Sequence, residues 1–257
     1  MPNPLANVTV LDLTHVLAGP FATMTLADLG ARVIKVERPR SGDDTRAFPP
    51  FKDGKSAYFS ALNHSKKSIA LDLKAEDDRA VFHRLLARAD VIVENFRPGV
   101  MERLGYGWRD LHAAYPRLIY GAVSGFGHTG PDARRPAYDM VAQARGGVMS
   151  ITGEAGGDPV RVGASIGDIV AGMYLTQGVL AALFDRETTG KGRKIDVAML
   201  DSQLAILEHA IAITTATATA AMTNIAVKKT AEAKRQKQNS KHFKNTIVNL
   251  YTISFSL

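Results

Sequence analysis

The chain contains no cysteine and no continuous apolar run of the roughly 18 residues that a membrane-spanning helix requires. Without cysteine it forms neither disulfides nor thiolate metal sites, which fits a cytoplasmic protein. Its first residues, MPNPLANVTV, lack a basic stretch followed by an apolar one, so no secretory signal is expected. The sequence therefore favours a globular protein with no membrane partner.

Positive charge is concentrated near the C-terminus. The formal net charge is +7, but residues 211–257 hold seven Lys and Arg against one Glu. Because residues 1–210 are nearly neutral, a nucleic-acid partner is not expected. The alternation of Thr and Ala over 213–224 predicts neither a firm strand nor a helix with an apolar face. We expect a folded unit over 1–210 and a basic, low-complexity, poorly ordered tail over 211–257.

The most informative segment is Val8–Pro39, which has the pattern of a strand–helix–strand unit. It predicts a strand over 8–13, a helix over 21–29 and a second strand over 32–36. Such a unit begins a doubly wound, mainly parallel, Rossmann-like α/β sheet, in which ligands bind beyond the carboxyl ends of the strands. His15 and Arg38 follow two such ends, which indicates a phosphate-bearing ligand.

The alternation of strands and helices continues to about residue 210. Further strands are predicted over 67–73, 91–93, 117–123 and 194–197. Further helices are predicted over 75–89, 101–104, 108–114, 138–148, 169–186 and 199–209.

Two motifs permit more than one interpretation. Gly125–Gly130 fits G-x-G-x-x-G, but Pro131 and Pro136 follow it, so it predicts a loop and not a nicotinamide or flavin site. His15 has no partner at metal-ligand spacing and is more typical of a hydrogen-bonded turn residue than of a metal ligand. No metal site is expected.

Asp168 follows Gly167 and precedes a long apolar helix. It is either the N-cap of that helix, a position that Asp favours, or an ionised carboxylate directed into a pocket as a covalent nucleophile. The residues alone leave both readings open. Asn95, Phe96 and Arg97 combine an amide, an aromatic ring and a cation at a strand end, a set able to stack on and hydrogen-bond an adenine.

Nine motifs occur in an order that resembles the class III CoA-transferase family, also called the CaiB/BaiF group, over about residues 5–210. They are THVLAGPFATMTLADLGARVIKVERP (14–39), GDDTR (42–46), NHSKKSIALDLK (63–74), VENFRPGVMERLG (93–105), SGFGHTGP (124–131), YDMVAQARGG (138–147), GDPVRVG (157–163), GASIGD (163–168) and TGKGRKIDVAM (189–199).

The resemblance implies a reaction between an acyl-CoA and a carboxylic acid acceptor. Asp168 corresponds to the family's nucleophile, which forms a mixed anhydride and then an aspartyl-CoA thioester. This exchange requires no metal and no permanently bound cofactor, because CoA itself enters as part of the substrate. The resemblance also assigns CoA contacts to ten residues: His15, Val16, Ala18, Arg38, Leu71, Lys74, Asn95, Phe96, Arg103 and Tyr138.

Tyr138 stands where racemases of the family carry a histidine, which implies transfer and not α-proton exchange. Leu17 replaces a glutamine of some formyl-CoA-specific members, so oxalate/formyl exchange is less favoured. GDDTR and the 152–163 loop resemble members that handle dicarboxylic acyl groups such as succinyl or glutaryl. The alternatives are an α-methylacyl-CoA racemase-like enzyme and a truncated, inactive CoA-binding remnant.

The resemblance implies an incomplete large domain. Family members are longer chains whose second half supplies a smaller domain and a glycine-rich loop over the active site. Two such chains form an interlocked homodimer. No motif of that half follows residue 210, so truncation is expected, and the dimer is not expected to close as a ring.

Overall fold

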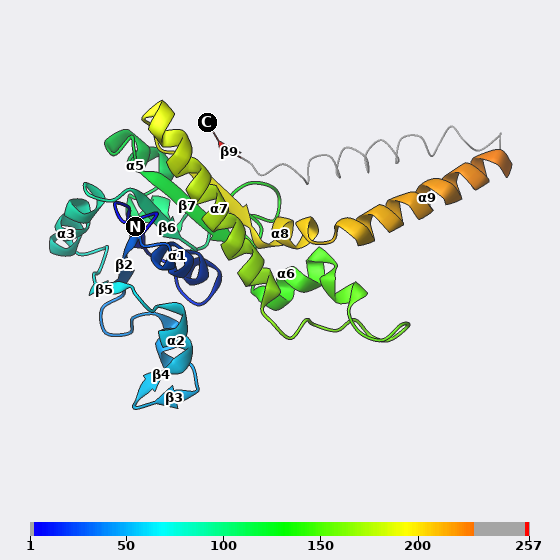
Figure 1. The fold of residues 1–257 in the computed structure, drawn as a ribbon, viewed down its shortest axis with the longest axis horizontal. Helices are drawn as coiled ribbons and strands as arrows, with labels where there is room; N and C mark the ends of the chain where they lie inside the picture. The colour runs from blue at the N-terminus through cyan, green and yellow to red at the C-terminus, as the bar shows by residue number, and fades with distance from the viewer. Residues whose placement is uncertain (1–2, 229–254, 257) are drawn as a thin grey trace.

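The computed structural model describes residues 3–228 and 255–256. One seven-stranded sheet has the order β5-β2-β1-β6-β7-β8-β9 and is parallel except for β9, which pairs antiparallel with β8 (Figure 1). In chain order, the strands are β1 (Thr9–Asp12), β2 (Arg32–Glu37), β5 (Lys67–Ala70), β6 (Val91–Glu94), β7 (Ile119–Ser124), β8 (Lys194–Ala198) and β9 (Phe255–Ser256). The predicted doubly wound, mainly parallel α/β sheet is confirmed.

Helices cover both faces of the sheet, so the central strands are buried on both sides. In β1, Val10 belongs to one core layer and Leu11 to the other, because successive side chains of a strand point to opposite faces of the sheet. One layer is covered by α1 (Ala18–Asp28), α6 (Asp139–Gly146), α7 (Ile166–Thr189) and α8 (Met199–Ala205). The other is covered by α3 (Glu76–Leu86), α4 (Val100–Leu104) and α5 (Trp108–Ala114).

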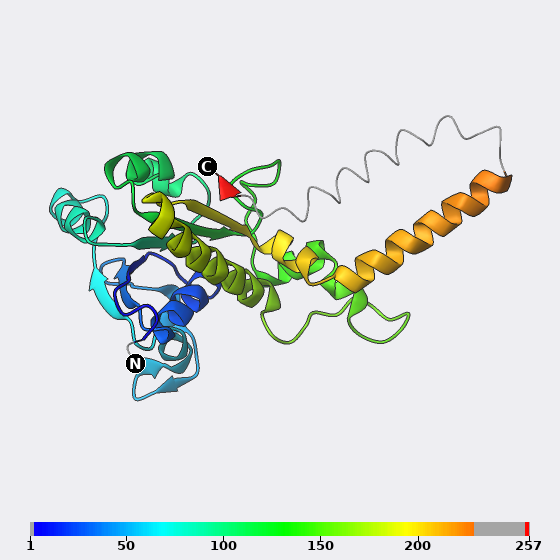
Figure 2. The ribbon, with the colours of Figure 1, turned by 45° about the horizontal axis from the view of Figure 1, so that its top comes forward.

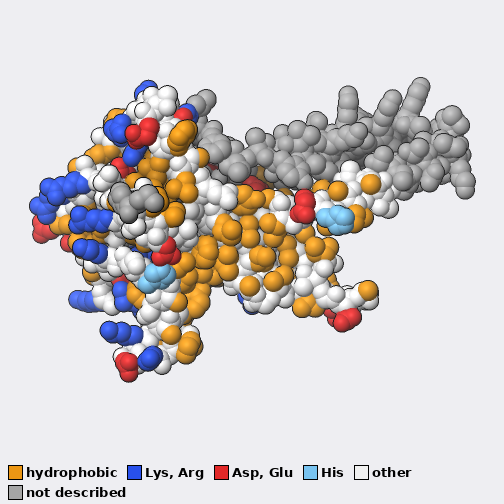
Figure 3. All heavy atoms as spheres, viewed as in Figure 1, with side chains coloured by type: hydrophobic (Ala, Val, Ile, Leu, Met, Phe, Trp, Pro, Cys, Tyr) orange, Lys and Arg blue, Asp and Glu red, His pale blue; other side chains and the backbone are white. Residues whose placement is uncertain are grey.

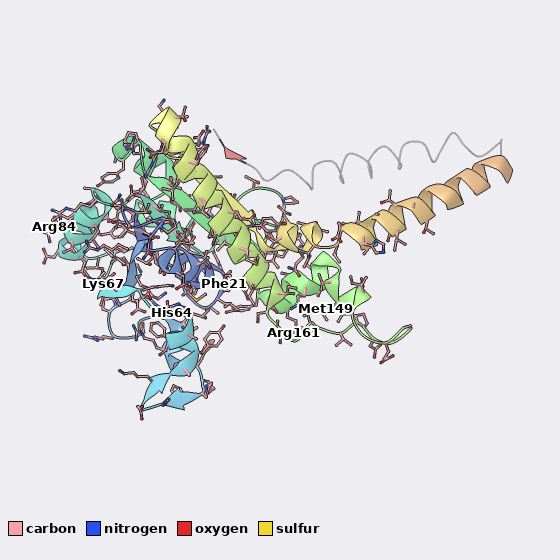
Figure 4. All side chains as sticks on the ribbon, viewed as in Figure 1. Phe21, His64, Lys67, Arg84, Met149 and Arg161 are labelled. Carbon is pink, nitrogen blue, oxygen red and sulfur yellow. The ribbon has the colours of Figure 1, made fainter. Side chains whose placement is uncertain are left out.

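Helix α7 lies directly against α1. Gly172 permits this approach, because a Cβ there would lie 2.7 Å from the Ala18 carbonyl oxygen and 3.0 Å from the Phe21 ring. Figure 4 shows Phe21 on α1, on the side where α7 passes. The close packing brings the first turns of both helices to the same edge of the sheet.

Helix α7 is also long and apolar enough to cross a membrane, and it is the one such helix in the part of the chain that the structure describes. Half of its apolar window is buried inside the protein, where Ala171, Leu175 and Val179 are fully enclosed. These contacts are those of a core helix that packs on a sheet.

Most predicted elements are found within a few residues of their expected bounds. The helix expected over 169–186 begins earlier, at Ile166, and runs to Thr189. Between β2 and β5 the structure adds elements that the sequence did not predict. They are a 3-10 helix (Asp44–Ala47), the hairpin of β3 (Phe51–Lys52) and β4 (Lys55–Ser56), and α2 (Ala57–Leu62).

The segment rich in Thr and Ala differs from its prediction. It forms α9 (Glu208–Lys228), which projects away from the rest of the protein (Figure 2). Residues 212–217 are exposed, so this stretch of the helix forms without burying an apolar face. Alanine has the highest intrinsic helix propensity, and the Thr214 hydroxyl donates to the Ala210 carbonyl at 2.8 Å. The boundary at residue 210 stays a prediction, and most of the predicted basic tail, 229–254, lies outside the described residues.

Candidate active site

Three adjoining cavities follow the carboxyl ends of the parallel strands. The first, of about 460 Å³, lies beyond β5 and β2, and the second, of about 190 Å³, beyond β2 and β1. The third, of about 320 Å³, lies beyond β1, β6 and β7. Phe96 lines all three, so they form one groove along this edge of the sheet. This is the edge at which doubly wound sheets bind their ligands.

The groove brings together most of the residues that the resemblance assigned to CoA and to catalysis. Leu71 and Lys74 line its first cavity, Arg38 its first two, and His15 its second and third. The others in the third cavity are Val16, Ala18, Asn95, Phe96, Tyr138 and Asp168. Arg103 is the exception: it lines none of the three, although Val100 and Leu104 of its helix α4 line the first.

Asp168 lies in the first turn of α7, and its carboxylate accepts a hydrogen bond from the Ala18 backbone N–H. Burial, together with the negative charge of Asp139, raises the pKa of Asp168 to about 7. The carboxylate that the sequence reading offered as an ionised nucleophile therefore populates both protonation states near neutral pH. The N-cap reading is wrong, since the N-cap is Ser165.

Asp139, which the sequence reading missed, holds the first turn of α7. Its Oδ1 accepts the Gly167 N–H at 2.8 Å, and its Oδ2 accepts from Gln143 Nε2 at 2.8 Å and from Arg161 Nε at 3.3 Å. Figure 4 shows Arg161 on the segment beside α6. The only sequence signal was its place in the YDM motif, next to Tyr138.

We expect Asp139→Asn to shift the pH dependence of any reaction that uses ionised Asp168. An asparagine keeps an oxygen for the Gly167 N–H but removes the charge that raises the pKa of Asp168. The pKa of Asp168 then falls, and activity at pH 6 rises relative to activity at pH 8. The measurement is a pH profile of kcat/KM, with exposed Asp158→Asn as the control. An unchanged midpoint would mean that burial alone sets this pKa.

The loops after β1 and β6 are joined through Asn95. Its Oδ1 accepts the His15 N–H at 2.9 Å, and its Nδ2 donates to the His15 carbonyl at 2.8 Å. The amide expected to bind an adenine is thus engaged with protein backbone. The rings of His15 and Phe96 lie 5.6 Å apart between centroids, and burial lowers the pKa of His15.

Val16 has a φ of 65°, which is unusual for a β-branched residue. Such a conformation costs about 1–3 kcal/mol and persists only where the surroundings impose it. Its N–H lies 3.4 Å from Asp43 Oδ1, and the Asp43 carboxylate pairs with buried Lys35 at 2.9 Å. Backbone strain is therefore located two residues before Ala18, the hydrogen-bond partner of Asp168.

Two predicted residues lie at the periphery of the groove. Tyr138 is 75% exposed at the mouth of the third cavity. Arg38 is exposed and pairs with Asp44 of the GDDTR motif. Tyr58 of α2 was not predicted. Its pKa is raised by burial and by the charges of Asp168 and Asp43, so α2 faces the site.

The described residues contain no group of three or more His, Asp or Glu side chains able to hold a metal ion. The polar groups of the groove are instead distributed along its length, from Lys74 at one end to Asp168 at the other. This arrangement suits an elongated ligand with its reactive end beside Asp168.

Comparison with known proteins defines the class. The family described as CoA-transferase family III matches residues 5–253, and the chain belongs to this family. A CaiB/BaiF family protein from Brucella suis has a similar structure, with a TM-score of 0.80, 42% identity and coverage of 84% of this chain and 58% of its own.

Two curated relatives have named activities. Acetyl-CoA:oxalate CoA-transferase from Acetobacter aceti is 52% identical over 215 residues, which are 83% of this chain and 55% of that protein. Succinyl-CoA:glutarate CoA-transferase from Homo sapiens is 48% identical over 207 residues, 80% of this chain and 47% of that protein. The chain thus spans about half the length of these relatives.

Proposed function

We propose that the chain carries the nucleophile and most of the CoA groove of an acyl-CoA:carboxylate CoA-transferase. The observation that carries this proposal is the carboxylate of Asp168, half-buried at the end of a groove along five strand ends and hydrogen-bonded to the Ala18 N–H. A metal is not needed for this chemistry, because a carboxylate can attack a thioester directly.

In the first half-reaction, an Asp168 oxygen bonds to the thioester carbonyl carbon, the carbon–sulfur bond breaks, and CoA leaves as a thiolate. The thiolate then attacks the Asp168 carbonyl carbon of the resulting anhydride. This step releases the donor carboxylate and leaves an aspartyl-CoA thioester. The acceptor acid reverses both steps, so that CoA departs on the new acyl group and Asp168 is regenerated. Backbone N–H groups near Asp168 would stabilise the oxyanion.

Dicarboxylic acids are the proposed substrate class. Arg97 and Arg135 line the same cavity as Asp168, and a guanidinium can pair with the second carboxylate of such a substrate. The named relatives support this class, since oxalate and glutarate both have two carboxylates. Tyr138 supplies a phenol in place of the imidazole of the family's racemases, which favours transfer.

A homodimer belongs to the same proposal. Hydrophobic side chains gather on the face where α7 and α6 lie (Figure 3), and Met140, Met173 and Phe184 are 58%, 49% and 82% exposed. Apolar surface of this kind indicates a partner surface. A second copy, or the portion of the relatives that this chain does not span, would cover it.

The test is to trap the covalent intermediate. Incubation with succinyl-CoA and hydroxylamine is expected to convert Asp168 to a hydroxamate, detected by mass spectrometry of the digested protein. If succinyl-, glutaryl-, oxalyl- and acetyl-CoA all leave Asp168 unmodified although CoA raises the melting temperature, the chain is the inactive CoA-binding remnant. Deuterium uptake at the α-carbon of a 2-methylacyl-CoA without a carboxylate would instead favour the racemase.

A further inference from the structure

Glu94 is a buried carboxylate immediately behind the groove. It is the last residue of β6 and precedes Asn95 and Phe96. Its Oε2 accepts the Phe96 N–H at 2.8 Å, and its Oε1 accepts the Tyr120 hydroxyl at 3.0 Å. Because Phe96 lines all three cavities, the side chain of Glu94 fixes the backbone at the centre of the groove.

His128 lies behind Glu94. Its Nε2 is 3.6 Å from Glu94 Oε1, and its backbone N–H donates to Asp196 at 2.9 Å. Its Nδ1 lies 3.1 Å from Lys194 Nζ, and an ammonium can only donate, so Nδ1 accepts and the ring hydrogen is on Nε2, facing Glu94. Among the described residues, Nε2 has no hydrogen-bond partner at ordinary distance.

The other groups that face Glu94 are Tyr120 from β7, Lys194 from β8 and Glu102 from α4. None of these compensates its charge at contact distance. Burial is the largest effect and raises the pKa of Glu94 to about 7, while the Phe96 and Tyr120 hydrogen bonds oppose the rise. The carboxylate therefore takes up a proton within the physiological range.

We propose that Glu94 is a positioning residue for CoA binding: its ionised carboxylate holds the Phe96 segment in the binding conformation, and proton uptake by Glu94, with His128 as its neighbour, releases it. An ionised acceptor forms a stronger hydrogen bond to the Phe96 N–H than a protonated one. The inference rests on the proposed function, because it requires that the groove binds CoA.

The direction in which pH changes the affinity for CoA follows from the hydrogen bond between Glu94 and the Phe96 N–H. Above pH 7 Glu94 is ionised and the Phe96 segment is held, so CoA binds tightly. Below pH 7 the acceptor is weakened and affinity falls. The difference between a charged and a neutral hydrogen bond corresponds to about a tenfold change in Kd between pH 6 and pH 8.5.

The test is calorimetric titration with CoA between pH 6 and pH 8.5, in an Asp168→Asn background, because Asp168 titrates in the same range. Glu94→Gln retains an oxygen for the Phe96 N–H but cannot ionise. We expect it to bind at the wild-type low-pH affinity at every pH. The control is Glu102→Gln, which removes a nearby exposed charge that does not contact Phe96. Because that charge raises the pKa of Glu94, the variant should keep the pH dependence of CoA binding and move its midpoint to lower pH.

His128→Asn keeps Glu94 and provides a second variant if Glu94→Gln does not fold. We expect it to retain the wild-type affinity at pH 8.5 and to move the midpoint of the transition. A pH dependence that persists in Glu94→Gln, or that is identical in His128→Asn, would overturn the inference while leaving the proposed function intact. Absence of CoA binding at every pH would overturn both.

Discussion

Asp168→Asn is expected to abolish acyl transfer and, at the same time, to stabilise the protein. Loss of the nucleophile should lower kcat/KM by at least about 10⁴-fold, because the amide cannot form the anhydride or the thioester. CoA binding at pH 8 should change little, since the groove lies mostly outside the contacts of this side chain.

The stabilisation follows from the raised pKa. In the unfolded chain Asp168 ionises near its ordinary value of 3.8, and in the folded protein it ionises near 7. Folding therefore takes up a proton between these values, and the cost of the buried charge is fully present above pH 7 and absent below about pH 4. At about 1.4 kcal/mol per pKa unit, discounted for partial solvent access, Asp168→Asn should gain about 2–4 kcal/mol at pH 8.

Urea unfolding at pH 8 and pH 4.5 measures this difference, and acyl transfer is assayed on the same preparations. Glu187→Gln, an exposed change on the same helix, is the matched control and should alter neither quantity. Retained activity would remove Asp168 from the reaction. An equal stability change at both pH values would mean that its carboxylate is not desolvated.

The fold was predictable because its first strand–helix–strand unit is contiguous in the sequence. A strand of period two, a helix of period 3.6 and a stop at Gly30 are all contained in Val8–Pro39, and they determine a right-handed parallel unit. The carboxyl ends of parallel strands all lie at the same edge of the sheet. The positions of His15, Arg38 and Phe96 along one groove therefore followed from the order of strands and helices alone.

The elements that the sequence analysis missed leave no periodic signal in the sequence. Each strand of the hairpin over 51–56 has only two residues, too few to show alternation, and the α9 segment has no apolar periodicity from which a helix could be inferred. Asp139 and Glu94 were missed for a different reason. Each forms a hydrogen bond to a residue distant in sequence and is buried, and neither motif spacing nor composition shows which side chains are buried. The pKa of Asp168 depends on the same unseen packing.

The loop that carries His15 to Ala18 rests on a buried charge network that no sequence pattern revealed. Lys66 Nζ donates to Asp12 Oδ2 at 3.0 Å and to Thr23 Oγ1 at 2.8 Å, and the side chains of the ion pair are 2% and 0% exposed. Asp12 Oδ1 in turn accepts the Thr14 N–H at 2.9 Å. Burial alone would raise the pKa of Asp12, but Lys35 and Lys66 hold it below its usual range.

Lys66→Met is therefore expected to destabilise the protein by about 3–5 kcal/mol, because it leaves the Asp12 carboxylate buried beside one remaining cation, Lys35. Urea unfolding at pH 7 measures the loss. Lys67→Met, an exposed change one residue away on β5 (Figure 4), should remain within about 0.5 kcal/mol of wild type. Adding Asp12→Leu to Lys66→Met should recover part of the loss, since an apolar pair removes the uncompensated charge. A loss below about 1 kcal/mol in the single variant would show that water or Lys35 already neutralises Asp12, and that the loop does not depend on this pair.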